Sequence, residues 1–308
     1  VACCAVLVGC GQLTAPSSAK GSDNSLRVVT DATGAVVQVP QKPCRIVTLT
    51  LATDEIVMEL VGPERIAAVS FMADDDGIST VAGQAKKVWA RAGGDAEAIL
   101  ALHPDLVLTP DWWRVETGQT LRQMGVPVYI YKVPNSVASV KDSIRSIAEA
   151  VNEPQRGERM IANMDAVLND VAQRTDSIKP ENQKTVVWFS SMSAASGKGS
   201  HFEDLCRYAR VNDGAALAGV KRGEVLSKEA LIQVNPDILL LPNWTNKGQI
   251  DTRAIRQEVE SDPAYRQMKA VQNHQLAAVA DRYLYCVSQY IVYGVRDIAS
   301  AAYPNLFE

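Results

Sequence analysis

Two copies of one short motif place tryptophans where they could bind a ligand. "HPDLVLTPDW" (103–112) and "NPDILLLPNW" (235–244) each combine Pro-Asp, an apolar run and a closing tryptophan, and Trp113 follows the first copy directly. Tryptophan offers a broad apolar face, so two opposed indoles can hold a bulky ligand between them. Alternatively, each tryptophan packs over the edge of a sheet and has only a structural role. The matched placement of Trp112 and Trp244 predicts two similar lobes whose indoles form opposite walls of one site.

Further candidates come from a general property of open α/β sheets, which bind ligands beyond the carboxyl ends of their strands. We therefore select residues that directly follow a predicted strand, together with one arginine in a loop of the second half. We expect Arg222, Arg282, Tyr283 and Tyr285 to orient the ligand. The other candidates are Thr50, Leu51, Phe71, Met72, Ser191 and Met192.

The motifs of common enzymes are absent from the sequence. "SGKGS" (196–200) lacks the leading glycine and the final Ser or Thr of a phosphate-binding loop, and we interpret it as a turn before a helix. The three histidines are dispersed, and neither a C-x-x-C pair nor a G-x-S-x-G elbow occurs. "DDDG" (74–77) is interpreted as a solvated acidic turn. The sequence therefore predicts no catalytic residue and no intrinsic metal site. A two-lobed transferase would need a phosphate-cradling turn or a pair of metal-binding carboxylates.

These candidates must be positioned by alternating strands and helices. Continuous apolar runs predict buried parallel strands, and residues with helical periodicity lie between them. The pattern predicts an α/β protein with two Rossmann-like lobes, each built on a central parallel sheet. The predicted strands are 45–49, 65–70, 105–109, 127–131, 185–190, 237–241 and 275–280, and the helices of the second half are 202–208, 228–234, 252–270 and 290–302.

One long amphipathic segment separates the two halves. Apolar residues with helical spacing and no internal proline predict a single helix, which joins the lobes stiffly. The expected divisions are a leader and tether at 1–26, a first lobe at 27–151, the connecting helix at 152–179 and a second lobe at 180–308.

The first residues differ from the rest of the chain. "VACCAVLVGC" resembles a lipobox whose Cys10 receives lipid, and a small, polar, flexible tether follows. A buried first strand or helix is the alternative. Cys44, Cys206 and Cys286 allow at most one disulfide, and a Cys44–Cys286 pair stays open at this point. The net charge of −4 gives no basic surface for nucleic acid, and no apolar run after residue 12 could cross a bilayer.

The order of these segments resembles the substrate-binding lipoproteins of ATP-driven importers for iron chelates, haem and cobalamin. The resemblance extends from Arg27 to Pro304 and is carried by "CRIVTLTLATDEIVMELVGPERIAAVS", both Pro-Asp motifs and the ending "AVQNHQLAAVADRYLYCVSQYIVYGVRDIASAAYP". It implies a monomeric binding protein, anchored outside the cytoplasm, that delivers a metal chelate to a permease driven by ATPase subunits. It also implies that Glu116 docks on the permease, with Asp251 as a weaker partner. Ordinary surface acids are the alternative for both.

The chelate follows less directly from the resemblance. Haem binders of this family often carry a tyrosine after the second strand, where this chain has Phe71 and Met72. Several arginines commonly hold an anionic siderophore, whereas paired tryptophans suit a broad and largely neutral macrocycle. We therefore favour a corrinoid slightly over a ferric siderophore, with haem as a further alternative. A lipoprotein used only for assembly or signalling would not need an aromatic cleft.

Overall fold

Two α/β lobes lie one above the other in the computed structural model, which describes residues 25–112, 115–189, 196–245 and 248–308. The first lobe contains a five-stranded parallel sheet in the order β5-β4-β3-β6-β7. Its strands are β3 (Ile46–Thr48), β4 (Ile66–Ser70), β5 (Ala90–Ala92), β6 (Leu106–Pro110) and β7 (Val128–Tyr131). Its helices are α1 (Leu51–Val61), α2 (Ala82–Ala85), α3 (Ala96–Leu100), α4 (Val115–Gln123) and α5 (Val137–Ala150), with 3-10 turns at Pro63–Arg65 and Phe71–Asp74.

The second lobe repeats this arrangement with a four-stranded parallel sheet in the order β13-β10-β8-β9. Its strands are β8 (Thr185–Trp188), β9 (Asn212–Asp213), β10 (Ile238–Leu241) and β13 (Leu276–Ala278). Its helices are α7 (His201–Tyr208), α8 (Gly214–Leu217), α9 (Lys228–Val234), α10 (Thr252–Ser261), α11 (Lys269–Gln272), α12 (Asp281–Tyr285) and α13 (Ile291–Ala302), with 3-10 turns at Pro180–Asn182 and Pro304–Leu306.

The α/β fold with parallel sheets is thus confirmed, and the local differences have physical causes. The predicted helix 252–270 is wrong, because α10 ends before Pro263 and Asp262 adopts an extended backbone. Two antiparallel hairpins escaped prediction because their strands are short or precede the repeated pattern. They are β1 (Leu26–Thr30) with β2 (Val36–Pro40), and β11 (Trp244–Thr245) with β12 (Gly248–Gln249).

The repeated Pro-Asp motif has the same structural role in both lobes. Asp105 accepts hydrogen bonds from the backbone N–H groups of Cys44 and Arg45, at 2.7 and 2.9 Å, just before β3. Asp237 likewise accepts one from the N–H of Thr185, at 2.8 Å, where β8 begins. Each aspartate therefore fixes the start of the neighbouring central strand, and this role explains why the motif occurs twice.

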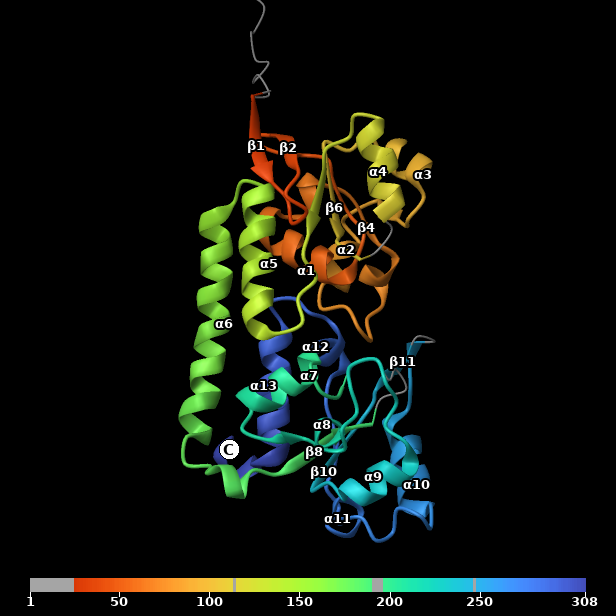
Figure 1. The fold of residues 1–308 in the computed structure, drawn as a ribbon. Coiled ribbons are helices and arrows are strands. Elements are labelled where there is room, and N and C mark those ends of the chain that lie inside the picture. The colour runs from red at the N-terminus through yellow and green to blue at the C-terminus, as the bar shows by residue number, and fades with distance from the viewer. Residues whose placement is uncertain (1–24, 113–114, 190–195, 246–247) are drawn as a thin grey trace, which may run out of the picture.

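The two lobes share one long helix, α6 (Pro154–Thr175), which runs along the side of both in Figure 1. It packs against α5 of the first lobe and against α13 and α7 of the second. Its buried residues form one stripe that includes Met160, Met164 and Val171, as the sequence predicts. A second link lies beside it, since Asp204 on α7 accepts a hydrogen bond from the N–H of Val137 on α5 at 2.8 Å.

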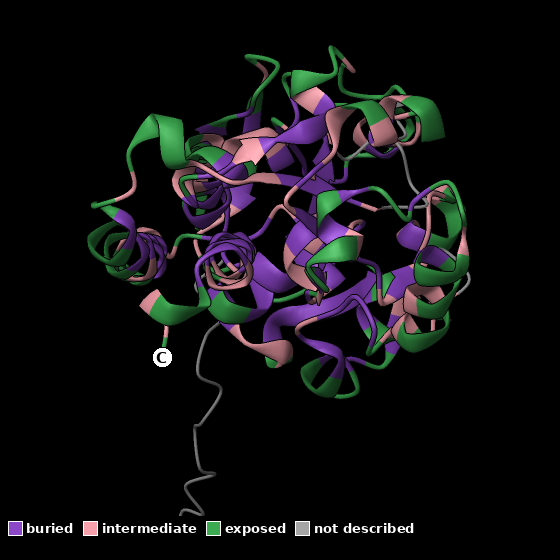
Figure 2. Ribbon diagram, turned by 90° about the horizontal axis from the view of Figure 1, so that it is seen from below, coloured by how far each residue is buried: buried purple, intermediate pink, exposed green. Residues whose placement is uncertain are grey.

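The buried residues are concentrated in the strands and on the helix faces that cover them (Figure 2). One apolar core extends through both lobes by way of α6. Within the described part of the chain, no helix combines the length and the apolar character needed to cross a bilayer.

Candidate functional site

An apolar cleft of about 530 Å³ lies where the carboxyl ends of the strands of both lobes meet. None of its described lining residues carries a charged side chain. The lining residues are Leu49, Thr50, Leu51, Ala52, Ser70, Phe71, Met72, Ile78, Ala92, Gly93, Trp112, Trp244, Tyr285, Cys286 and Val287.

The cleft brings together seven of the residues that the sequence proposes as ligand contacts, namely Thr50, Leu51, Phe71, Met72, Trp112, Trp244 and Tyr285. The two repeated tryptophans lie in very different environments. Trp112 is 65% exposed, whereas Trp244 is 4% exposed. Phe71 is 67% exposed. The first lobe therefore presents accessible aromatic faces, and the second presents an indole fixed in a packed wall.

Trp244 is held by a buried carboxylate of its own lobe. Asp281 accepts hydrogen bonds from the N–H groups of Asn243 and Trp244, at 2.7 and 2.9 Å, and from the indole of Trp188 at 3.2 Å. Burial raises the pKa of Asp281, while these donors oppose the shift. The ring of Tyr285 lies against both indoles, with its centroid 4.5 Å from Trp188 and 5.7 Å from Trp244. Contacts within the second lobe therefore hold the backbone of Trp244 and pack Tyr285 against its ring.

A buried hydroxyl network supports the first-lobe side of the cleft. Thr50 caps α1, and its hydroxyl lies 3.0 Å from the hydroxyl of Tyr131. Burial raises the pKa of Tyr131 to about 12, so this phenol stays neutral. Asp54 accepts hydrogen bonds from the hydroxyls of Thr48 and Ser70, and burial raises its pKa to about 6. Tyr131 and Asp54, which bond to the cleft residues Thr50 and Ser70, therefore have pKa values above their usual ranges.

Three other proposed contacts lie outside this cleft. Arg222 is exposed, and its backbone N–H donates to the carbonyl of Lys198. Arg282 and Tyr283 fall on α12, a short helix that follows β13. The guanidinium of Arg282 donates to the carbonyl of Asp76, and Tyr283 packs on the ring of Tyr293. Trp113, Ser191, Met192 and Cys10 lie outside the described residues.

The two acids proposed for docking are both on the surface. Glu116 is exposed in the first turn of α4. Asp251 caps α10 by accepting from the N–H of Arg253 at 2.9 Å, and the Arg253 side chain lowers its pKa.

Cys286 is one of several lining residues that the motifs did not indicate. It follows α12, is buried and free, and donates its thiol to Glu55 of the other lobe at 2.9 Å. Burial raises the pKa of this thiol well above its usual range. Cys44 is free and exposed, so the open possibility of a Cys44–Cys286 disulfide does not hold. The position of Cys286 shortly after the predicted strand 275–280 was the signal in the sequence that could have placed it near the cleft.

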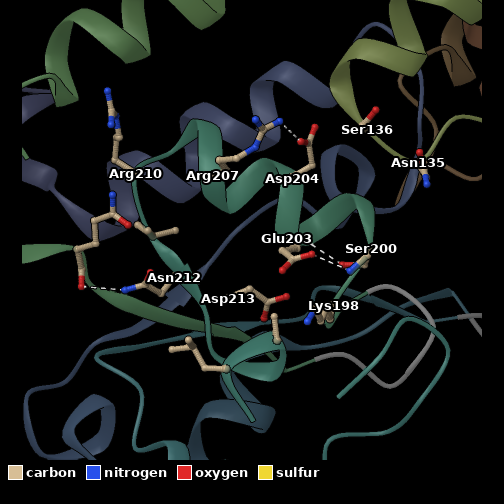
Figure 3. Close-up of a pocket in the computed structure, with 15 residues that line it drawn as sticks. Asn135, Ser136, Lys198, Ser200, Glu203, Asp204, Arg207, Arg210, Asn212 and Asp213 are labelled. Carbon is tan, nitrogen blue, oxygen red and sulfur yellow. Dashed lines mark hydrogen bonds and ion pairs between the residues drawn. The ribbon is translucent and has the colours of Figure 1, made fainter. Parts of the chain in front are cut away.

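A second pocket of about 710 Å³ lies beside α7 and is polar (Figure 3). Its acidic side chains hold the local backbone. Asp213 accepts from the N–H groups of Gly197 and Ala215, and Glu203 accepts from the N–H of Gly199. These bonds fix the turn "SGKGS", which precedes α7 as expected. The acids of this pocket are therefore structural, and the apolar cleft is the better candidate site.

Comparison with known proteins agrees with this architecture. Residues 46–283 match the family described as periplasmic binding protein. The chain belongs to this family. A periplasmic binding protein captures a solute for transport and is not an enzyme, in agreement with the absence of catalytic motifs. In the part of the chain that the structure describes, no cluster of three His, Cys, Asp or Glu side chains could hold a metal ion.

Several proteins are similar to this periplasmic binding protein over most of its length. An uncharacterised ABC transporter substrate-binding lipoprotein of Bacillus subtilis, YvrC, is 23% identical, over 98% of this chain and 95% of its own. The Fe(3+)-citrate-binding protein YfmC of the same organism is 25% identical, over 89% and 84%. Among solved structures, the haem-binding protein RhuT from Roseiflexus, in apo form, has a TM-score of 0.71 at 25% identity, over 85% of this chain and 98% of its own.

Proposed function

We propose that this chain is the solute-binding component of an ATP-driven importer and that it captures a metal chelate in the apolar cleft. The observation that carries the proposal is the cleft itself. It lies between two lobes, takes residues from the strand ends of both sheets, and contains no charged side chain among its described lining residues. Its volume is within the usual range for small-molecule sites. YfmC is an Fe(3+)-citrate-binding protein and RhuT is a haem-binding protein, and both support a chelate as the ligand class.

Within that class we favour a corrinoid. Ferric citrate and many ferric siderophores carry negative charge, and a site for them needs cationic partners to offset desolvation. The described lining residues offer hydroxyls and apolar faces instead. Trp112 and Phe71 are exposed and suited to stacking on a broad macrocycle. A ferric siderophore and haem remain the alternatives that the experiment below distinguishes.

Delivery would use surfaces away from the cleft. We propose that Glu116 and, less strongly, Asp251 contact the permease, and that lipid on Cys10 anchors a monomer outside the cytoplasm. Both acids are exposed, and Glu116 has no ion pair among the described residues. An exposed ion pair contributes about 1 kcal/mol or less, so docking by such pairs would be weak and reversible.

Tryptophan fluorescence tests the proposal directly. The full chain would be titrated separately with cyanocobalamin, a cobinamide, haemin, ferric citrate and a ferric hydroxamate siderophore. We expect saturable quenching by a corrinoid at sub-micromolar concentration, because Trp112 and Trp244 both line the cleft. Quenching by haemin or a ferric chelate alone would keep the transport role and overturn the corrinoid preference. A folded protein that responds to none of the five would contradict capture of a metal chelate.

A further inference from the structure

The acidic run Asp74–Asp76, followed by Gly77, joins the two lobes at one edge of the cleft. The interpretation of this run as a solvated turn is wrong for its central residue. Asp74 forms an ion pair with Arg91 of the same lobe, and each of its carboxylate oxygens lies 2.6 Å from a guanidinium nitrogen. Asp75 instead accepts a hydrogen bond from the indole N–H of Trp244, at 2.8 Å, from the second lobe. Neighbouring aspartates therefore have different roles.

The loop is shaped to lie directly against this indole. The second carboxylate oxygen of Asp75 accepts from the N–H of Gly77 at 2.9 Å, which orients the carboxylate. A Cβ on Gly77 would lie 2.6 Å from Cδ1 of Trp244 and 2.7 Å from Cγ of Gln249. Real side chains do not tolerate such distances, so glycine is required for this close approach. Packing and hydrogen bonding thus act on the same ring.

A second contact between the lobes lies beside the first. Arg282, which the sequence proposed as a ligand contact, donates to the carbonyl oxygen of Asp76 at 2.7 Å. Ile78 directly follows the loop and lines the cleft together with Trp244. The contacts of residues 75–77 with the second lobe therefore lie at the boundary of the ligand site.

We infer that Asp75 is a positioning residue, which fixes the indole of Trp244 in the cleft wall and clasps the two lobes around a ligand. The inference rests on the proposed capture function, because it assigns a role within that site. A hydrogen bond from a neutral donor to a carboxylate is stronger than one between neutral groups. Separation of the lobes must break this hydrogen bond, which is already formed before a ligand arrives. The clasp therefore slows both the entry and the release of a ligand that requires the lobes to separate.

A ligand-free measurement tests the clasp by itself. The full chain is labelled with ¹⁵N-tryptophan, the Trp244 indole signal is assigned with Trp244→Phe, and exchange of its N–H with solvent is followed. We expect at least tenfold faster exchange in Asp75→Ala. In Asp75→Asn, which keeps an acceptor oxygen, the rate should stay within threefold of wild type. Gly77→Ala, which displaces the ring and leaves Asp75 in place, should also accelerate exchange.

Asp74→Asn is the matched control, because it removes a neighbouring carboxylate whose partner, Arg91, is in the same lobe. Its exchange rate should equal that of the wild type. Equal indole exchange in the wild type, Asp75→Ala and Gly77→Ala would overturn the clasp whether or not a ligand is found.

Stopped-flow kinetics then separate positioning from general structural support. With cyanocobalamin, or whichever of the five chelates quenches fluorescence, Asp75→Ala should raise the dissociation rate constant about tenfold and should not lower the association rate constant. An effect confined to association would contradict the inference. If none of the five chelates binds, the proposed function fails, and indole exchange alone decides whether the clasp exists.

Discussion

The hydroxyl of Ser288 in the second lobe donates a hydrogen bond to the carboxylate of Glu55 in the first, at 2.5 Å. Glu55 lies on α1 and is completely buried. Its other oxygen accepts from the N–H and the hydroxyl of Thr80, at 2.9 and 2.6 Å, and the thiol of Cys286 donates to the same oxygen as Ser288. Burial raises the pKa of Glu55, and the donors oppose this shift. One carboxylate thus joins α1, the loop before α2 and the segment after α12.

Replacing Glu55 should destabilise the whole protein. In Glu55→Leu the donors of Thr80 and Ser288 lose their acceptor, and we expect the free energy of unfolding to fall by about 3 kcal/mol. Glu55→Gln keeps one acceptor oxygen, and its free energy of unfolding should fall by about 1 kcal/mol. Urea unfolding followed by circular dichroism measures both. Glu64→Gln, at an exposed position in the same lobe, is the control and should be neutral. Equal stabilities of Glu55→Leu and Glu64→Gln would remove the proposed role of the carboxylate.

Asp54 should make stability depend on pH in the acid range. Burial raises its folded-state pKa to about 6, above an unfolded value of about 4. Between these values the folded protein binds more protons than the unfolded chain, so the free energy of unfolding falls as pH rises. The full effect is about 3 kcal/mol and is complete above pH 6.

The test for Asp54 compares the wild type with Asp54→Asn in urea unfolding from pH 4 to 7. The stability of the wild type relative to the variant should decrease across this range. Asp142→Asn, at a more exposed position on α5, controls for the loss of one carboxylate. Parallel curves for the wild type and Asp54→Asn would show that burial of Asp54 is not coupled to protonation.

Removing the accessible tryptophan of the cleft should weaken binding without unfolding the protein. Trp112 is 65% exposed, so Trp112→Ala leaves no large internal cavity. We expect affinity for the chelate found by titration to fall at least tenfold, or about 1.4 kcal/mol. Trp89→Ala is the matched control, since Trp89 is 79% exposed and does not line the cleft. Equal affinities of the two variants would exclude Trp112 as a wall of the site.

Trp244→Ala should also weaken binding at least tenfold, but at a cost in stability. The ring is 4% exposed, and truncating a buried tryptophan typically costs about 3–5 kcal/mol. Affinity must therefore be measured at a temperature where circular dichroism shows the variant folded. Unchanged affinity under that condition would contradict the two-wall arrangement.

Charge reversal at the proposed docking acid should separate transport from binding. Glu116→Arg should reduce uptake of the chelate by cells several-fold and leave its affinity in solution unchanged, since Glu116 does not line the cleft. Glu97→Arg, at another exposed position in the first lobe, is the control. Equal uptake by the two variants would show that Glu116 is an ordinary surface acid that does not dock on the permease.

The sequence by itself determined the two-lobed α/β architecture. Apolar runs, helical periodicity and the repeated Pro-Asp motif depend on neighbours along the chain, and these local patterns are sufficient to define strands and helices. They also placed Thr50, Trp112 and Trp244 at strand ends that line the cleft. The single helix predicted at 252–270 failed because Pro263 interrupts the segment, although its periodicity continues.

Only the tertiary structure decided how the repeated residues differ. Trp112 and Trp244 occupy equivalent motif positions, yet one is exposed and the other is enclosed by Asp75 and Gly77 from the opposite lobe. The same applies to Arg282, which a turn of α12 directs to the carbonyl of Asp76. These contacts join residues more than 160 positions apart, and no periodicity along the chain records which surfaces meet when two lobes pack together.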